Sequence, residues 1–292
     1  MRRRTAALAL AICLSGSVAG CSLGAGSGSA PPPDLSLANL QPSPTAAPSS
    51  GASGTTPAPA TGLAAELAQR ASHSTAGLRS AHLTMTSVVG TTRMTMSGQI
   101  GYRPVQLDVT AAVKVPVNGA VRNVRVREIL VGKTLYLNVP GLPGAKPWHS
   151  LSLSQLSQYS GLDLTSMMNN TNADPTVRLL TQAGDLRLVG VETVAGGRTR
   201  HLAGTVDLDR VFAAMPASER AAVASLRDAM DQLGVAEMRI ELWVNAADVP
   251  VKLVQSYQTS LGPARTTMYL THLNARTTIS APPRSQVEPF RG

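Results

Sequence analysis

The sequence has 292 residues and a formal net charge of +9, and 43% of its residues are hydrophobic while only 3% are aromatic. This length is ample for one domain with a sizeable core. The excess positive charge comes mainly from arginine and forms no cluster with interleaved aromatic residues, which argues against nucleic-acid binding and fits a protein beside an anionic membrane.

The N-terminal segment has the three parts of a lipoprotein signal sequence. Residues 2–4 are arginines, and residues 6–14 form an uninterrupted apolar run that is too short to span a membrane as a helix. Val18, Ala19 and Gly20 then lead into Cys21. In this order the parts resemble a bacterial lipoprotein signal that ends in a lipobox.

The resemblance implies cleavage before Cys21 and a diacylglyceryl thioether on its sulfur. We therefore expect an extracytoplasmic protein that is lipid-anchored to the outer face of the plasma membrane. The alternative is an ordinary secretory signal that leaves Cys21 as a free thiol. Cys13, the other cysteine, would leave with the signal, so the folded part would have no disulfide and would depend on burial alone.

The segment after Cys21 predicts a disordered tether. Residues 22–62 are rich in Ala, Ser, Gly, Pro and Thr, and Asp34 is their only ionisable residue. Such a composition buries too little apolar area to offset the entropy of ordering. The chain thus divides into a signal peptide (1–20), a lipidated cysteine with its tether (21–62) and a folded domain (63–292).

The first half of the domain begins as a helix and continues as strands. Apolar residues at helical spacing predict a helix over residues 63–74. Alternating runs follow, with short polar turns between them, and Asn118-Gly119 is a strong hairpin signal. Such a series predicts an antiparallel meander. Its five runs lie within residues 83–86, 94–97, 106–115, 121–131 and 135–139.

The rest of the domain mixes helical and strand patterns. Residues 140–147 predict a loop that leads to Trp148, Asp207 and Ser218 are expected N-caps, and Pro282-Pro283 is expected to close the domain. Helices are predicted at 154–159, 162–168, 174–182, 207–214 and 218–233, and strands at 186–194, 198–206, 238–244, 251–257 and 265–273. This order predicts an α+β fold with one large antiparallel sheet, which must curl, and with helices covering one face.

Several short segments also resemble a known family. They are Lys133-Thr-Leu-Tyr-Leu, Pro147-Trp148, Gly204-Thr-Val-Asp-Leu, Leu242-Trp-Val-Asn and Ile279-Ser-Ala-Pro-Pro. In this order they are similar to LppX/LprAFG-type actinobacterial lipoproteins, in the wider LolA-like group, from about residue 64 to residue 287. The resemblance implies a half-barrel with helices across its concave face, and an apolar cavity that in several members holds the acyl chains of a lipid or lipoglycan. Tyr159-Ser-Gly departs from the Tyr-Asp-Pro of some members, which puts the entrance geometry in doubt.

The sequence contains no recognisable catalytic set. Its five histidines lie in separate segments without metal-ligand spacing, and it has neither a Gly-x-Ser-x-Gly motif nor a phosphate loop. His149 and His201 are interpreted as hydrogen-bonded surface residues. Asp207 and Asp209 are better explained by a helix start than by a catalytic pair. We therefore expect no enzymatic activity, no metal and no cofactor.

Methionine and leucine would make a pliable lining for alkyl chains, although each methionine is also explained as core filling. With the family resemblance, the expected cavity residues are Met94, Met96, Leu135, Leu137, Trp148, Leu164, Met167, Met168, Leu180, Phe212, Met215 and Met230. An anionic head group would meet Arg178, Arg187 or Arg200 at the mouth.

The leading hypothesis is a membrane-tethered monomer that carries a lipid or lipoglycan. Its partners would be that ligand and the plasma membrane, with no nucleic acid. The alternative is a non-enzymatic envelope scaffold or sensor whose core is packed solid, and a surface hydrolase is the weakest hypothesis.

Overall fold

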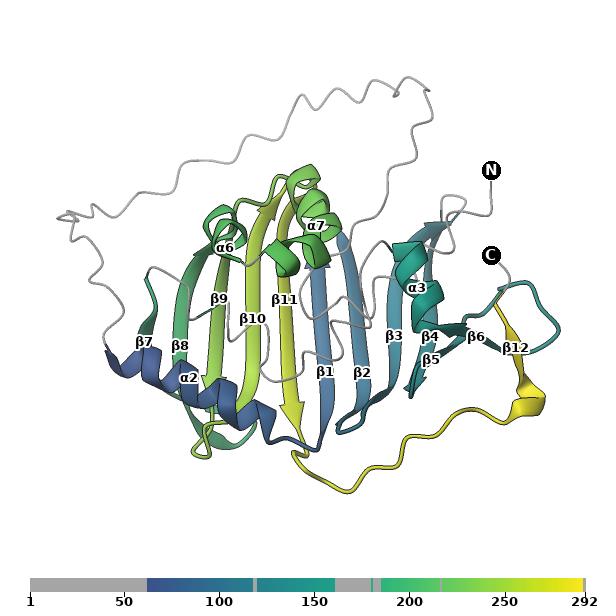
Figure 1. Ribbon diagram of the computed structural model, residues 1–292, viewed down its shortest axis with the longest axis horizontal. Coiled ribbons are helices and arrows are strands. Elements are labelled where there is room, and N and C mark those ends of the chain that lie inside the picture. The colour runs from purple at the N-terminus through teal and green to yellow at the C-terminus, as the bar shows by residue number, and fades with distance from the viewer. Residues whose placement is uncertain (1–61, 118–119, 161–179, 181–184, 216, 291–292) are drawn as a thin grey trace, which may run out of the picture.

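The computed structural model describes residues 62–117, 120–160, 180, 185–215 and 217–290. Figure 1 shows one large sheet with a few helices packed on it. The strands are β1 (Ser80–Val89), β2 (Thr92–Tyr102), β3 (Val105–Val117), β4 (Ala120–Val131), β5 (Thr134–Asn138), β6 (Trp148–Ser152), β7 (Arg187–Val194), β8 (Gly197–Asp207), β9 (Glu237–Val244), β10 (Pro250–Thr259), β11 (Gly262–Thr271) and β12 (Val287–Pro289). The helices are α2 (Gly62–Ala76), α3 (Leu153–Ser160), α6 (Leu208–Ala214), α7 (Ala217–Gln232) and the 3-10 helix η1 (Arg284–Gln286).

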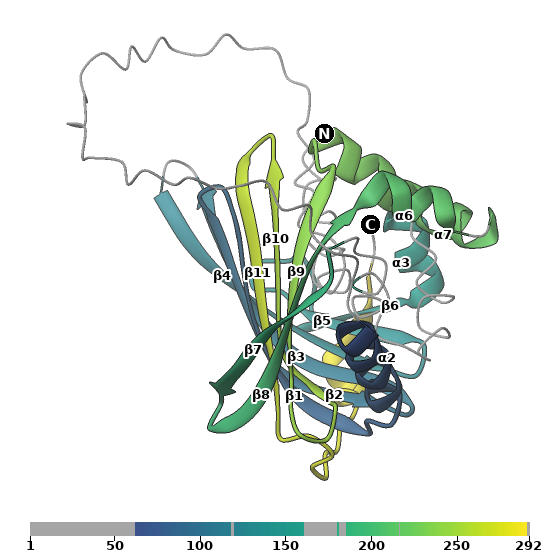
Figure 2. The ribbon, with the colours of Figure 1, turned by 90° about the vertical axis from the view of Figure 1, so that its left-hand side faces the viewer.

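The sheet consists of two meanders that meet at their first and last strands. Its order is β12-β6-β5-β4-β3-β2-β1-β11-β10-β9-β8-β7. Strands β1 to β6 follow one another in space as they do in sequence, and so do β7 to β11. The antiparallel pair β1–β11 joins the two series, with Met85 opposite Met268. Figure 2 shows that the sheet curls and that the helices lie on the inner side of the curl.

The structure confirms the predicted α+β class with a large curled sheet and helices on its concave face. The sheet is mixed rather than wholly antiparallel, because β12 pairs with β6 in parallel. Neither β6 nor β12 is predicted by the sequence, which assigns Trp148 to the end of a loop and closes the domain at Pro282-Pro283. Strand β6 has five residues and β12 has three, so both are too short for an alternation of apolar and polar residues to be recognised.

Most of the described helices lie where the sequence predicts them. Asp207 is the N-cap of α6, and its side chain accepts a hydrogen bond of 3.0 Å from the backbone N–H of Arg210. Helix α7 begins at Ala217, so Ser218 lies in its first turn instead of capping it. The predicted signal peptide, the tether up to residue 61 and the helix over 162–168 lie outside the described residues, as does the helix over 174–182 except for Leu180.

Among the described residues, the largest hydrophobic cluster lies where helices cover strands β8 to β11. We call it the helix-covered cluster. Its helical members are Ala64, Leu67, Ala68 and Ala71 of α2, Leu208 and Val211 of α6, and Met230 of α7. They pack on concave-face strand residues that include Leu202, Ile240, Leu242, Leu253 and Tyr257. The buried stripe of α2 consists of Leu67 and three alanines, Ala64, Ala68 and Ala71.

We expect Leu242→Ala to destabilise the domain by about 2–5 kcal/mol, because the leucine is 1% exposed and its loss leaves a cavity in the helix-covered cluster. The matched control is Leu261→Ala, at a residue that is 56% exposed, which should change the free energy of unfolding by less than about 0.5 kcal/mol. Urea titrations followed by circular dichroism measure both values. Equal effects of the two substitutions would contradict the assigned core.

Candidate functional site

A row of apolar side chains crosses the concave face from one meander to the other. Paired residues on neighbouring strands point to the same face, so the register identifies the row. The row consists of Leu202, Leu242, Leu253, Met268, Met85, Met96 and Ala111, on strands β8, β9, β10, β11, β1, β2 and β3 in turn. We call it the apolar row. It runs without a polar residue from the helix-covered strands to the centre of the sheet.

The centre of the sheet has a hydrophobic cluster of its own, which we call the central cluster. Its buried members are Ala81, Leu83, Met85, Met94, Met96, Val109 and Leu270. Met85, Met94 and Met96 are only 2–4% exposed. Every residue of this cluster comes from β1, β2, β3, β11 or the segment after β11, and none comes from a helix that the structure describes.

The predicted cavity residues divide among several clusters. Met94 and Met96 belong to the central cluster. Leu135 and Leu137 pack with Leu153 and Leu156 of α3 on the same face. The helix-covered cluster contains Leu180 and Met230, with Phe212 and Met215 packed against it. Leu164, Met167 and Met168 lie outside the described residues.

Trp148 lies on the other face of the sheet. In β6 it is on the opposite side from Leu151, which pairs with Leu135. It packs with Ile129 and Ile279, and the Arg127 guanidinium lies 5.7 Å from its ring centroid. The structure therefore does not bring Trp148 together with the other predicted cavity residues. Its side of the sheet cannot be assigned from sequence, because the five residues of β6 are too few to show a strand pattern.

Two residues that belong beside the predicted set are absent from it. Met85 and Met268 are opposite each other across β1 and β11, in the middle of the apolar row. Their alternation with threonines was visible in the sequence, but the pairing of β1 with β11 was not. Without that long-range pairing, no pattern placed Met268 beside Met85.

The expected head-group arginines already have carboxylate partners where they are described. Arg187 contacts Asp185 at 3.2 Å. Arg200 forms an ion pair with Asp248 and donates a 3.0 Å hydrogen bond to the carbonyl of Asn245. Arg178 lies outside the described residues. The structure therefore does not present Arg187 and Arg200 as a pair of cations that are free to bind an anionic head group.

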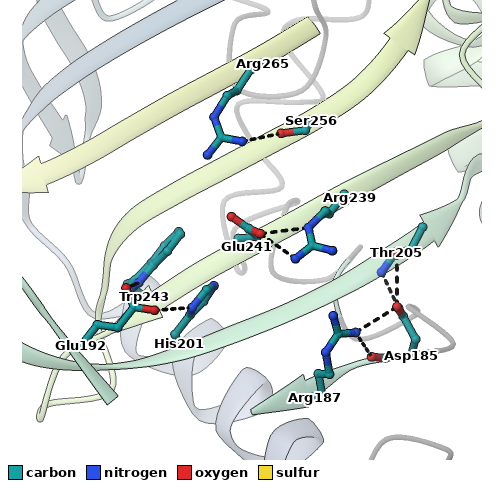
Figure 3. A network of polar contacts seen from close by, with 10 residues as sticks. All are labelled: Asp185, Arg187, Glu192, His201, Thr205, Arg239, Glu241, Trp243, Ser256 and Arg265. Atoms are coloured by element: carbon teal, nitrogen blue, oxygen red, sulfur yellow. Dashed lines mark hydrogen bonds and ion pairs between the residues drawn. The ribbon is translucent and has the colours of Figure 1, made fainter. Parts of the chain in front are cut away.

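A polar and aromatic network lies on the convex face of β7, β8 and β9 (Figure 3). The ring of His201 stacks on Trp243 at 4.0 Å between centroids, and its Nδ1 lies 2.7 Å from Oε1 of Glu192. Trp243 Nε1 donates a 2.8 Å hydrogen bond to Oε2 of the same carboxylate. Lys252 Nζ lies 3.7 Å from the Trp243 ring centroid. The network ties the edge strand β7 to its neighbours.

Two of the described histidines, His149 and His201, lie beside carboxylates. His201 and His149 are bonded or paired as expected, but both are buried and not at the surface. Nδ1 of His149 lies 3.6 Å from Glu288, and its ring meets Phe290 edge to face. Among the described residues no group of three or more His, Cys, Asp or Glu side chains could hold a metal ion. No helix in that part of the chain is both long and apolar enough to cross a membrane.

The family model described as "LppX_LprAFG lipoprotein" matches residues 63–260. The chain belongs to this lipoprotein family. The match begins one residue after the start of α2 and ends just before β11, so it covers both helices and strands of the concave face. It confirms the family resemblance that the sequence segments indicate.

Two curated relatives come from Streptomyces. A putative lipoprotein of Streptomyces coelicolor is 27% identical over 139 residues, which are 48% of this chain and 40% of the relative. An uncharacterized 31.2 kDa protein of Streptomyces griseus is 23% identical over 151 residues, 51% of this chain and 50% of the relative. The chain spans half or less of the length of these relatives.

Two solved structures are similar in arrangement at low sequence identity. LprF from Mycobacterium bovis has a TM-score of 0.46 and 17% identity, over 77% of this chain and 99% of that one. The lipoprotein LppX from Mycobacterium tuberculosis has a TM-score of 0.43 and 14% identity, over 75% of this chain and 98% of that one.

Glu192 gives the convex network a dependence on pH. Hydrogen bonds from Trp243 and His201 lower the pKa of its carboxyl below the ordinary 4.5. A carboxyl with a lowered pKa in the folded state adds stability above the unfolded pKa, and this stability is lost as the pH falls through the folded value. We therefore expect Glu192→Gln to be less stable than the wild type at neutral pH, with the difference shrinking below about pH 4.5.

Urea midpoints measured between about pH 7 and about pH 3 check this expectation. The control is Glu237→Gln, which removes an exposed carboxylate at the start of β9. A difference between Glu192→Gln and wild type that stays constant over the whole range would show that the network does not depend on the ionised carboxylate.

Proposed function

We propose that the protein is a membrane-tethered carrier that holds a lipid or lipoglycan by its acyl chains on the concave face. Family membership supports this class of ligand, and the apolar row supports its location. The row continues beyond the strands that α2, α6 and α7 cover, onto β1, β2 and β3. Alkyl chains on this face would gain about 25 cal/mol for each Å² of apolar surface removed from water.

Methionines give the central cluster the adaptability that such a ligand needs. Met85, Met94, Met96 and Met268 meet at the middle of the sheet. An unbranched thioether side chain with three rotatable bonds repacks at low cost when its surroundings change. A surface of this kind can accept acyl chains of different length without a change in the backbone of the sheet.

The proposed anchor is Cys21. A diacylglyceryl group adds two acyl chains, and two chains hold a protein stably on a bilayer where one binds only reversibly. The protein would then work outside the cytoplasm, at the outer face of the plasma membrane. We propose no enzymatic reaction.

A non-enzymatic scaffold or sensor is the second candidate. One observation favours it: Met85, Met94 and Met96 of the central cluster are already 96% or more buried, as in a packed core. Under this alternative the concave face would hold the domain together and would not open for a ligand. Lipid binding decides between the two proposals.

The first experiment looks for bound lipid by native mass spectrometry of the full chain, produced in an actinobacterial host and kept in mild detergent. Val109→Trp is expected to reduce the lipid-bound fraction at least about tenfold, because an indole at this buried central position occupies the surface on which the chains lie. Thr110→Trp is the matched control, since Thr110 is exposed on the opposite face of the same strand.

Bound lipid in the wild type and in Thr110→Trp, with loss only in Val109→Trp, supports the carrier. A wild-type protein that carries no lipid and takes none from added lipid favours the scaffold. Circular dichroism of both variants shows whether the loss comes from unfolding.

The second experiment tests the anchor. We expect Cys21→Ser to move the protein from the membrane fraction to the soluble extracytoplasmic fraction, because no thioether can form. The control Cys13→Ser should stay with the membrane, since residue 13 is expected to be removed with the signal. Membrane retention of Cys21→Ser would overturn the proposed anchor.

A further inference from the structure

A short polar row borders the apolar row on the concave face. Gln255 of β10 pairs with Thr266 of β11, and Thr266 pairs with Ser87 of β1. The next residues in register at either end of this row are Ile240 and Met94, which are both apolar. Three neutral polar side chains therefore lie together between apolar residues, where the helix-covered cluster meets the central cluster. The concave face also carries the buried carboxylate of Glu128, which lies in a different row, between Val109 of β3 and Leu137 of β5.

The hydroxyl groups of Ser87 and Thr266 are hydrogen-bonded to each other, and the side-chain amide nitrogen of Gln255 has no hydrogen-bond partner. Ser87 Oγ and Thr266 Oγ1 are 3.0 Å apart. Gln255 is 4% exposed, and its Nε2 is buried without a hydrogen-bond partner. Leaving a buried donor unsatisfied is costly, and most buried polar groups in folded proteins are satisfied. An amide kept in this state on a proposed binding face points to a ligand that supplies the missing acceptor.

The surroundings restrict what that acceptor can be. The row carries no charged side chain, and burying an unpaired phosphate or carboxylate beside it would cost far more than a hydrogen bond returns. A neutral oxygen is therefore required. The apolar row runs one step away along each strand, with Leu253, Met268 and Met85 next to the three polar residues on their own face.

We propose that Gln255, with Ser87 and Thr266, recognises the ester carbonyl oxygens of an acylated ligand whose alkyl chains lie along the apolar row. This proposal rests on the proposed function and adds a chemical requirement to it. The ligand must carry neutral ester groups at the root of its acyl chains, as acylglycerols do. Ether-linked lipids of the same length offer the same alkyl surface without the carbonyl.

The test supplies the full chain with equal amounts of dipalmitoylglycerol and its ether analogue dihexadecylglycerol, and native mass spectrometry reads the ratio of the two complexes. We expect the wild type to favour the ester about fivefold, the value of roughly one net hydrogen bond. In Gln255→Met, which keeps the length of the side chain but removes the amide, the ratio should fall to about one. Ether binding should remain as in the wild type.

Gln258→Met is the matched control, because Gln258 lies on the same strand with its side chain exposed on the other face. It should keep the wild-type ratio. In the absence of lipid, Gln255→Met should melt at the same temperature as the wild type or higher, since it removes an unsatisfied buried donor. Ser87→Ala provides a second, smaller change if Gln255→Met does not fold.

The outcomes separate the two proposals. If wild-type protein binds both lipids equally, or if Gln255→Met keeps the ester preference, the ester site is wrong while the carrier function stands. If the wild type binds neither lipid, the carrier function fails and the ester site fails with it.

Discussion

The pairing of β1 with β11 is the constraint on which the rest of the structure depends. It joins residues 80–89 to residues 262–271 and so makes one sheet from two meanders. Without it, the helix-covered strands and the methionine-rich strands would be separate sheets, each with two free edges. With it, seven strands contribute one residue each to a continuous apolar row, and the whole concave face becomes a single surface.

The two faces of this sheet have different chemistry. On the convex face, charges and rings satisfy one another, as in the network of Glu192, His201 and Trp243. On the concave face, apolar residues dominate, and Ser87, Thr266 and Gln255 form a short neutral polar row among them. A ligand with long alkyl chains and a neutral polar root matches that distribution, whereas a water-soluble charged ligand does not.

The local features of the fold were accessible from sequence because they depend on nearest neighbours along the chain. Alternation of apolar residues located most of the strands, and Asp207 located the start of α6. The features that sequence did not yield depend on distant contacts. Strand β12 exists because residues 287–289 meet β6, and its three residues carry no pattern of their own.

The candidate site divides in the same way. Met94 and Met96 were identified from strand alternation together with the family resemblance, and they lie in the central cluster. The sequence predicts Trp148 beside them although it lies on the convex side, because a residue at the end of a predicted loop has no predictable face. The sequence does not reveal that Gln255 Nε2 lacks a hydrogen-bond partner. Whether a buried amide finds a partner depends on how the interior packs and not on the residue type.

The most direct measurement of the central claim is photo-crosslinking with a lipid that carries a diazirine midway along an acyl chain. After irradiation of the full chain and digestion, mass spectrometry locates the adducts. The account predicts adducts at concave residues of β1, β2 and β11, with Met85, Met96 and Met268 among them. Adducts confined to the convex face, or none above the level of a heat-denatured sample, would contradict it.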